Sequence, residues 1–308
     1  HGLGELFMFG FGQDTAITAD EAILYWRNSS AVWTDSTSRD DTHDGGVGTV
    51  TDKFEITSIV EHKGTALALI RTDYLYHPNG PSRVQIIKGT SATAWTRVGA
   101  GGASHPGTDA YGLQSDGTSL FCAVGTTSIP IKKSTDDGAT FATTLVTINA
   151  SGRIRGSALY GDGSATPALD YWCATPEGLY HVDVSASVFT PKFTFRHPQS
   201  SYSGQMVLGY IGSAYGIFFT DGPDIYFGFW AEDGFVAREL GIAARTPDGV
   251  VLAKQGDVTA IDYIPDEHVL AFAMGGLDAS HNACVWKLEL DTLNLAIPRY
   301  HCFYKNST

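Results

Sequence analysis

The sequence predicts an all-β fold, a six-bladed β-propeller whose blades are four-stranded antiparallel sheets. Three observations lead there: a composition typical of strands and turns, an apolar run that recurs six times, and further strand-like runs around each recurrence. The 308 residues include 35 glycines and only three methionines, and 12% are aromatic. Thr, Ser, Val, Tyr and Phe are frequent while Glu and Lys are sparse, a balance that favours strands over helices.

The recurring apolar run marks the expected second strand of each blade. The centres of the six runs lie about 50 residues apart, within the range of propeller repeats. The runs occur at 22–26, 66–70, 119–124, 170–175, 215–220 and 269–274. Most of them follow another strand-like run and a short turn containing Gly, Asp or Pro, as hairpins require.

A third and a fourth strand-like run follow each apolar run, for example RVQIIKG and AWTRVG in the second unit. Radial repetition of such units leaves only short, protected sheet edges. We therefore expect one domain over 1–308. Its approximate blades are 1–54, 55–106, 107–152, 153–202, 203–256 and 257–308. Two packed β-sandwiches are the alternative, but they do not explain a four-strand period.

The first unit is the least regular of the six. ELFMFGFG, AILYW and AVWTD supply its first three expected strands. The segment VGTVTDKF, residues 47–54, is expected to supply the fourth.

One turn between a third and a fourth strand has a specific pattern, KKSTDDGATF at 132–141. Its glycine can take positive φ without steric cost, and its first Asp can bond back onto its own turn. The pattern resembles the Asp-box of sialidase-type propellers at Ser134, Asp136, Gly138, Thr140 and Phe141. The resemblance implies that the polar side chains hold the turn together and that the aromatic ring packs between neighbouring sheets. Only this one box is intact.

Propeller loops that join second to third strands, and each blade to the next, are expected to gather on one face. Tyrosines there offer planar amphipathic surface, and arginines offer fork-shaped donors. We expect a polar site for sugar hydroxyls or for the loops of a partner; the alternative is that long surface loops are simply polar. The candidate residues are Tyr74, Tyr76, His77, His105, Arg153, Arg155, His197, Tyr202, Asp221, Asp224, Asp278 and His281.

A sialidase-like hydrolase is the catalytic alternative. The family resemblance implies three arginines, a Tyr–Glu pair and an Asp, but the Arg-Ile-Pro motif is missing and GRIRGS at 152–157 lies in the wrong blade. Glycoside hydrolysis needs two carboxylates about 5–10 Å apart. Asp221, Asp224 and Asp278 could supply them, and Glu177 is the one glutamate in these loops. We therefore expect no catalytic residue in this chain.

The four cysteines are widely spaced and form no C-x-x-C pair, which argues against a zinc site. Cys122 and Cys173 lie inside apolar runs, where a thiol is expected to be a small buried hydrophobe. Cys284 and Cys302 are close enough in sequence to bond across one sheet, although spacing alone does not settle pairing.

No cofactor is expected, and calcium is the one metal that the sequence suggests. Asp40, Asp41 and Asp44 could offer oxygen ligands, with two glycines for the bend. The segment lacks the closing Glu of a known calcium loop, so a solvated acidic loop is the preferred interpretation. The histidines are scattered over four loops, which does not predict a shared metal site.

Charge and hydropathy narrow the choice of partners. The formal charge of −13 argues against nucleic acid or an anionic membrane surface as partner. No apolar run reaches the roughly 18–20 residues of a membrane-spanning helix. The chain begins at His1 rather than Met, which is compatible with the removal of an N-terminal Met or of a targeting segment before this sequence starts.

The sequence thus favours a non-catalytic module of an extracellular or virion assembly that docks to a protein partner or a surface glycan and can form a homo-oligomer. Its diverged repeats, low charge density and loop-rich face loosely resemble those of propeller modules of phage tails and extracellular adhesion proteins. A secreted lectin and a sialidase-like hydrolase are the alternatives. A WD-type intracellular scaffold is a weaker one, because no blade ends in Trp-Asp after a Gly-His.

Overall fold

The computed structural model shows an all-β chain that divides into two compact units, His1–Asn149 and Ala150–Thr308. The residues that it describes are 6–13, 20–27, 33–35, 54–72, 83–91, 94–98, 106–107, 109–161, 169–240, 256–274, 284–290 and 299–305. Among them there is no helix long and apolar enough to cross a membrane.

Unit 1 contains three antiparallel sheets. The N-terminal sheet consists of β1 (Leu6–Gln13), β2 (Asp20–Arg27) and β3 (Trp33–Asp35). The second sheet consists of β4 (Phe54–His62), β5 (Thr65–Thr72), β6 (Arg83–Ser91) and β7 (Ala94–Val98). The third sheet consists of β8 (Ala110–Ser115), β9 (Leu120–Val124), β10 (Ile129–Ser134) and β11 (Thr143–Ile148).

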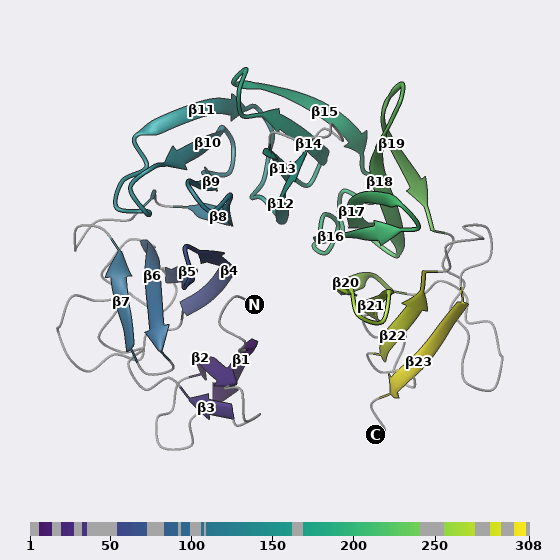
Figure 1. The fold of residues 1–308 in the computed structure, drawn as a ribbon, viewed down its shortest axis with the longest axis horizontal. Coiled ribbons are helices and arrows are strands. Elements are labelled where there is room, and N and C mark those ends of the chain that lie inside the picture. Colours follow the sequence, from purple (N-terminus) through teal and green to yellow (C-terminus); the bar gives the residue numbers. More distant parts are fainter. Residues whose placement is uncertain are drawn as a thin grey trace. The chain divides into compact units, whose positions relative to one another are not determined.

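Unit 2 contains three four-stranded sheets (Figure 1). The first consists of β12 (Gly156–Gly161), β13 (Leu169–Ala174), β14 (Gly178–Asp183) and β15 (Val188–Thr194). The second consists of β16 (Met206–Ile211), β17 (Ala214–Asp221), β18 (Asp224–Ala231) and β19 (Gly234–Glu239). The third consists of β20 (Val258–Ile264), β21 (Val269–Met274), β22 (Cys284–Glu289) and β23 (Arg299–Lys305). Strands pair in chain order, and the first strands of successive sheets contact each other.

The second strand of each sheet is the apolar run found in the sequence, which confirms the predicted period. Residues 66–70, 120–124, 170–174 and 216–220 are buried without interruption. A strand covered on both faces reads as a continuous apolar run rather than an alternating one. The fourth strands β15 and β19 are mostly half-buried or exposed, so their sequences are more polar.

The β-propeller architecture is confirmed, but the prediction of six four-stranded blades is wrong. Within the described residues the structure shows five four-stranded blades, and the N-terminal sheet has three strands. Phe54, expected to close the first blade, instead begins β4 and pairs with Thr72 of β5. The rest of VGTVTDKF lies outside the described residues. Its few apolar side chains gave weak strand signal, and its one aromatic residue belongs to the next sheet.

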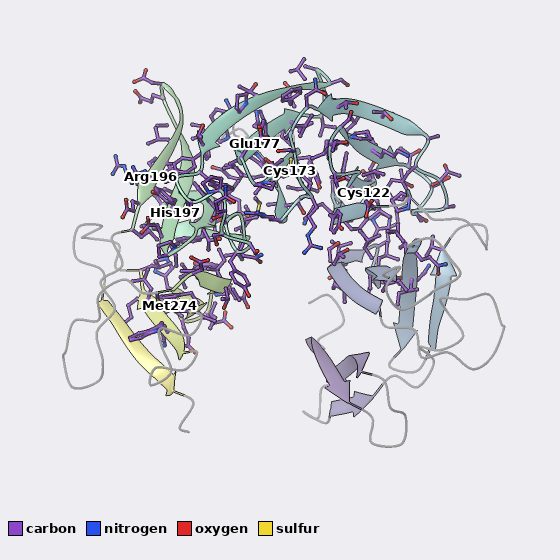
Figure 2. The ribbon with its side chains drawn as sticks, turned by 180° about the vertical axis from the view of Figure 1, so that it is seen from behind. Cys122, Cys173, Glu177, Arg196, His197 and Met274 are labelled. Carbon is purple, nitrogen blue, oxygen red and sulfur yellow. The ribbon has the colours of Figure 1, made fainter. Side chains whose placement is uncertain are left out.

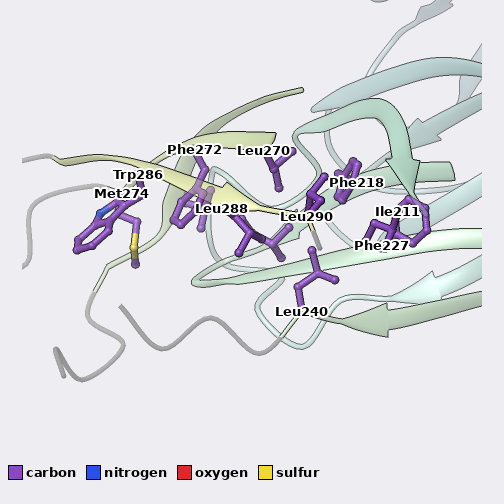
Figure 3. Packing of buried hydrophobic residues seen from close by; sticks show 12 residues of the cluster. Ile211, Phe218, Phe227, Leu240, Leu270, Phe272, Met274, Trp286, Leu288 and Leu290 are labelled. Atoms are coloured by element: carbon purple, nitrogen blue, oxygen red, sulfur yellow. The ribbon is translucent and has the colours of Figure 1, made fainter. Parts of the chain in front are cut away.

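Buried apolar side chains fill the spaces between neighbouring sheets within each unit. In unit 2, Phe218 and Phe227 of one sheet pack with Leu270, Phe272 and Leu288 of the next (Figure 3). Full burial of such a side chain stabilises the fold by about 1.5–3 kcal/mol. These layers therefore hold each blade against its neighbour.

Two of the four cysteines are also buried. Cys122 and Cys173 are free and buried, as predicted, and burial raises the pKa of both thiols, which makes them unreactive at neutral pH. In the last sheet Cys284 lies opposite Lys305 and Cys302 opposite Trp286. Cys284 and Cys302 are therefore not register partners.

Candidate functional site

The candidate site is one end of unit 2, where connections between blades meet the turns between second and third strands. We call it the loop face and define it as residues 151–155, 175–177, 195–205, 220–224 and 256–257. Its residues are joined by hydrogen bonds that run across all three blades of the unit, as the following contacts show.

Asp221, at the end of β17, fixes the 195–205 connection. Its side chain is completely buried. Oδ2 accepts the backbone N–H of Arg196 at 2.7 Å, and Oδ1 accepts that of His197 at 2.9 Å. The His197 ring Nδ1 lies 3.1 Å from the Asp221 carbonyl oxygen and donates to it. A buried carboxylate needs such donors because loss of water disfavours its charge.

Ser203 and Gly222 bring the same connection against the β17–β18 turn. The Ser203 hydroxyl donates to the His197 carbonyl at 2.9 Å and accepts the Gly222 N–H at 2.8 Å. Gly222 has a φ of +60°, and a Cβ placed there would lie 2.9 Å from the His197 Cβ. Only glycine satisfies both the dihedral angle and the close approach.

The 195–205 connection is also tied to the blades on both sides. Toward the third blade, Ser200 Oγ donates to Asp257 Oδ2 at 2.6 Å. Toward the first blade, Arg155 Nη1 donates to the Ser200 carbonyl and Nη2 to the Pro198 carbonyl at 3.4 Å. The connection is therefore a fixed segment despite having no regular secondary structure.

Three side chains of this segment are exposed or partly exposed. Figure 2 labels Arg196 and His197, which lie side by side after β15. Arg196 is 66% exposed and forms an ion pair with Glu239 at 3.5 Å. The His197 ring is partly exposed, and Tyr202 is 44% exposed. The face thus offers a guanidinium, an imidazole and a phenol on a rigid base.

The carboxylate side chains of the loop face have structural roles. Asp221 and Asp224 are register partners and both are buried. Glu177 accepts the hydroxyl of Ser151 at 2.8 Å and its N–H at 3.1 Å, and these hydrogen bonds lower the pKa of Glu177. A general acid needs a raised pKa, so Glu177 is not suited to that role. The described part of the chain contains no group of three or more metal-ligating side chains.

The structure brings together part of the predicted set. Hydrogen bonds join Arg155, His197, Tyr202, Asp221 and their neighbours, and Arg153 is close enough for its charge to help burial lower the pKa of Arg155. Other predicted residues lie outside the described side chains: Tyr74, Tyr76, His77, His105, Asp278, His281, and the calcium candidates Asp40, Asp41 and Asp44. Sequence reasoning missed Ser200, Ser203, Gly222 and Asp257, whose contacts join segments about 20 to 60 residues apart.

The Asp-box-like turn lies in unit 1, between β10 and β11. Asp136 Oδ1 accepts the Thr140 N–H at 2.9 Å and the Ser134 hydroxyl at 2.7 Å, and Oδ2 accepts the Thr140 hydroxyl at 2.6 Å. These hydrogen bonds, those from Thr140 first, lower the pKa of Asp136 to about 2. Phe141 is buried with Leu69 and other residues of the preceding sheet. The turn therefore has a structural role in this chain.

A second contact of this turn joins two blades of unit 1. The buried His62 ring of β4 lies 2.8 Å from Ser115 Oγ through Nδ1 and 3.0 Å from Asp137 Oδ1 through Nε2. Lys63 also forms an ion pair with Asp137. Ser, His and Asp are the residue types of a hydrolase triad, but here His62 is buried between two sheets and links them.

Comparisons with known proteins show the fold and no more. The sequence matches no family model and no curated protein. The structure is similar to a structural-genomics protein from Lactobacillus plantarum, with a TM-score of 0.57 and 12% identity over 99% of this chain and 82% of that one. A likeness to Saccharomyces cerevisiae Sqt1 has a TM-score of 0.49 and 8% identity, over 81% and 76% of the two chains. Kinship with Asp-box propellers stays a resemblance of residues 134–141.

Proposed function

We propose that the chain is a non-catalytic β-propeller binding module that docks to a partner through the loop face of unit 2. The observation that carries the proposal is the fixed 195–205 segment, on which Arg196, His197 and Tyr202 are exposed or partly exposed. Its backbone is already ordered by buried Asp221 and Ser203. Binding to an ordered segment avoids much of the entropy cost of ordering a loop.

The residue types on this segment suit a protein partner. Arginine and tyrosine are enriched among the residues that dominate binding energy at interfaces. Arg196 is held beside Glu239 without being covered, so it can still reach a carboxylate or a carbonyl of a partner. The setting that we propose is the one favoured by the sequence, an extracellular or virion assembly of the phage-tail kind.

A secreted lectin is the second candidate, because the half-exposed Tyr202 ring can stack on a sugar. A sialidase-like hydrolase at this face is less well supported. Of the candidate carboxylates that the structure describes, Asp221 is buried and hydrogen-bonded, and Glu177 is held at a lowered pKa.

The test introduces a photo-crosslinking residue in place of Tyr202 in the full chain, expressed in its natural source. The matched control replaces Val188, which is 51% exposed at the other end of the first blade of unit 2. We expect one protein to be captured from position 202 and not from position 188. Equal capture at both positions, or none at 202, contradicts a protein partner on the loop face.

A glycan array and a chromogenic sialoside assay separate the alternatives. Array signal that Tyr202→Ala removes would indicate a lectin. Turnover of the sialoside by purified chain would overturn the non-catalytic proposal.

A further inference from the structure

The hairpin of β16 and β17 brings two tyrosines together next to its tip. Its strands are joined by a two-residue turn in which Gly212 has a φ of +61°. Glycine with positive φ at the first central position is typical of a type II′ turn. The pair that flanks such a turn, here Ile211 and Ala214, exchanges both backbone hydrogen bonds, so the following pair is of the non-hydrogen-bonded kind. That following pair is Tyr210 and Tyr215.

The two phenol rings are in contact with each other and open to solvent. Side chains stand closest in non-hydrogen-bonded pairs. The ring centroids of Tyr210 and Tyr215 are 4.6 Å apart at an interplanar angle of 37°, and the two residues are 46% and 40% exposed. Among the tyrosine–tyrosine contacts that the structure describes, only this one has both rings exposed, because Tyr160, the other neighbour of Tyr215, is buried.

Buried aromatic residues of the neighbouring blade hold this pair in place. The Tyr160 hydroxyl of β12 donates to the Tyr215 carbonyl at 2.7 Å, and the two rings meet edge to face at 5.7 Å. Trp172 in turn donates its indole N–H to the Tyr160 carbonyl at 3.1 Å. The backbone under the pair is therefore anchored, and the two exposed rings stay within reach of each other.

The contact between the two rings favours one reaction, the coupling of phenols. Cross-strand tyrosines also stabilise a hairpin without any chemistry, and packed rings leave no shared open face for a ligand. Each phenol, however, yields a radical when a one-electron oxidant removes one electron and one proton. Two such radicals join through the ring carbons ortho to the oxygens when they meet. Here they are already in contact. Glu232 and Asp233, exposed at the same end of the sheet, disfavour an anionic ligand but do not repel a neutral oxidant.

We propose that Tyr210 and Tyr215 are an oxidative modification site, where a carbon–carbon bond between the two rings forms a dityrosine cross-link. Each phenol O–H loses one electron and one proton. The two ortho carbons then join, and the hydrogen on each of these carbons moves to its ring oxygen as a proton. The oxidant is hydrogen peroxide acting through a haem peroxidase; it takes up the two electrons and two protons and leaves as two waters.

The surroundings of the pair suit this reaction. Burial raises the pKa of Tyr215, and the nearby Tyr210 adds to this, so the phenol of Tyr215 is protonated at neutral pH and its proton passes to water. The cross-link would tie β16 to β17 beside the turn. Oxidative cross-links persist in extracellular settings, but the site does not depend on the function proposed for the loop face.

The first test treats the full chain with a haem peroxidase and limiting hydrogen peroxide and then with trypsin. Both tyrosines lie in the tryptic fragment 197–238, which contains no Lys or Arg before its last residue. We expect this fragment to become lighter by two hydrogen atoms, to show dityrosine fluorescence and to give no fragment ions from cleavage between 210 and 215. An unchanged fragment overturns the proposal. So does coupling only between two chains, or oxidation of Trp172 in place of coupling.

The second test asks whether the fold and these two phenols are responsible. Tyr210→Phe and Tyr215→Phe keep a ring but remove a phenol, so each should abolish the loss of two hydrogens. Tyr263→Phe is the matched control, because Tyr263 stacks on Phe218 rather than on a tyrosine, and it should leave the yield unchanged. Coupling that survives Tyr210→Phe refutes the site.

A ruthenium photo-oxidant needs no enzyme and therefore allows the same measurement on the chain unfolded in urea. We expect a higher yield of the 210–215 cross-link from the folded chain, because only the fold keeps the rings in contact. Equal yields from the folded and the unfolded chain would show that closeness in sequence alone brings the rings together, and would overturn the proposal.

Discussion

Single side chains hold the loop face in place, and Asp221 is one of them. Asp221→Ala leaves two backbone N–H groups, those of Arg196 and His197, without their acceptors. Such losses cost about 2–4 kcal/mol in free energy of unfolding, and Asp221→Asn, which keeps one acceptor, should cost less. Urea unfolding measures the loss in free energy of unfolding for both variants. The exposed Asp233 is the control, and Asp233→Ala should stay within about 0.5 kcal/mol. Equal effects at 221 and 233 would contradict the assigned role.

Asp136 gives a pH-dependent prediction at the same scale. Its folded-state pKa is about 2, below the ordinary value of 3.8. A lowered folded pKa means that the stabilisation is present above about pH 4 and is lost as pH falls toward 2. Thr140→Val removes the largest cause of the shift, so carboxyl NMR titration should show the pKa of Asp136 rising toward 3.8. An unchanged pKa would show that the hydrogen bond from the Thr140 hydroxyl is not responsible.

At the scale of the element, the β17–β18 turn depends on Gly222. Gly64 is a close match, because its φ is +73° against +60° for Gly222, but a Cβ at Gly64 meets nothing within 4 Å. Gly64→Ala should therefore show only the backbone cost of about 1 kcal/mol. Gly222→Ala should cost more and should speed hydrogen exchange at the Arg196 and His197 amides. If the two alanine variants behave alike, the close approach to His197 is unimportant.

The individual strands also show how much of the fold could be predicted from the sequence. Strands such as β9 and β13 were predictable because burial on both faces makes their apolar runs continuous. The assignment of Phe54 to the second sheet was not predictable, because Phe54 fits either sheet by pattern and only its pairing with Thr72 decides. The candidate site shows the same limit. Asp221 was singled out as a ligand contact, whereas its partners lie about 25 residues away in sequence and give it a structural role.

At the scale of the whole molecule, the question is how cooperatively the blades unfold. In repeat architectures stability is approximately a sum of unit and nearest-neighbour terms. Leu288 is buried between the last two sheets, and Leu288→Ala should cost about 2–5 kcal/mol. Native-state hydrogen exchange of the full chain should show that loss at β17 and β18 of unit 2 while β9 of unit 1 keeps its protection. A uniform loss in both units would instead support the single cooperative domain over 1–308 that the sequence predicts.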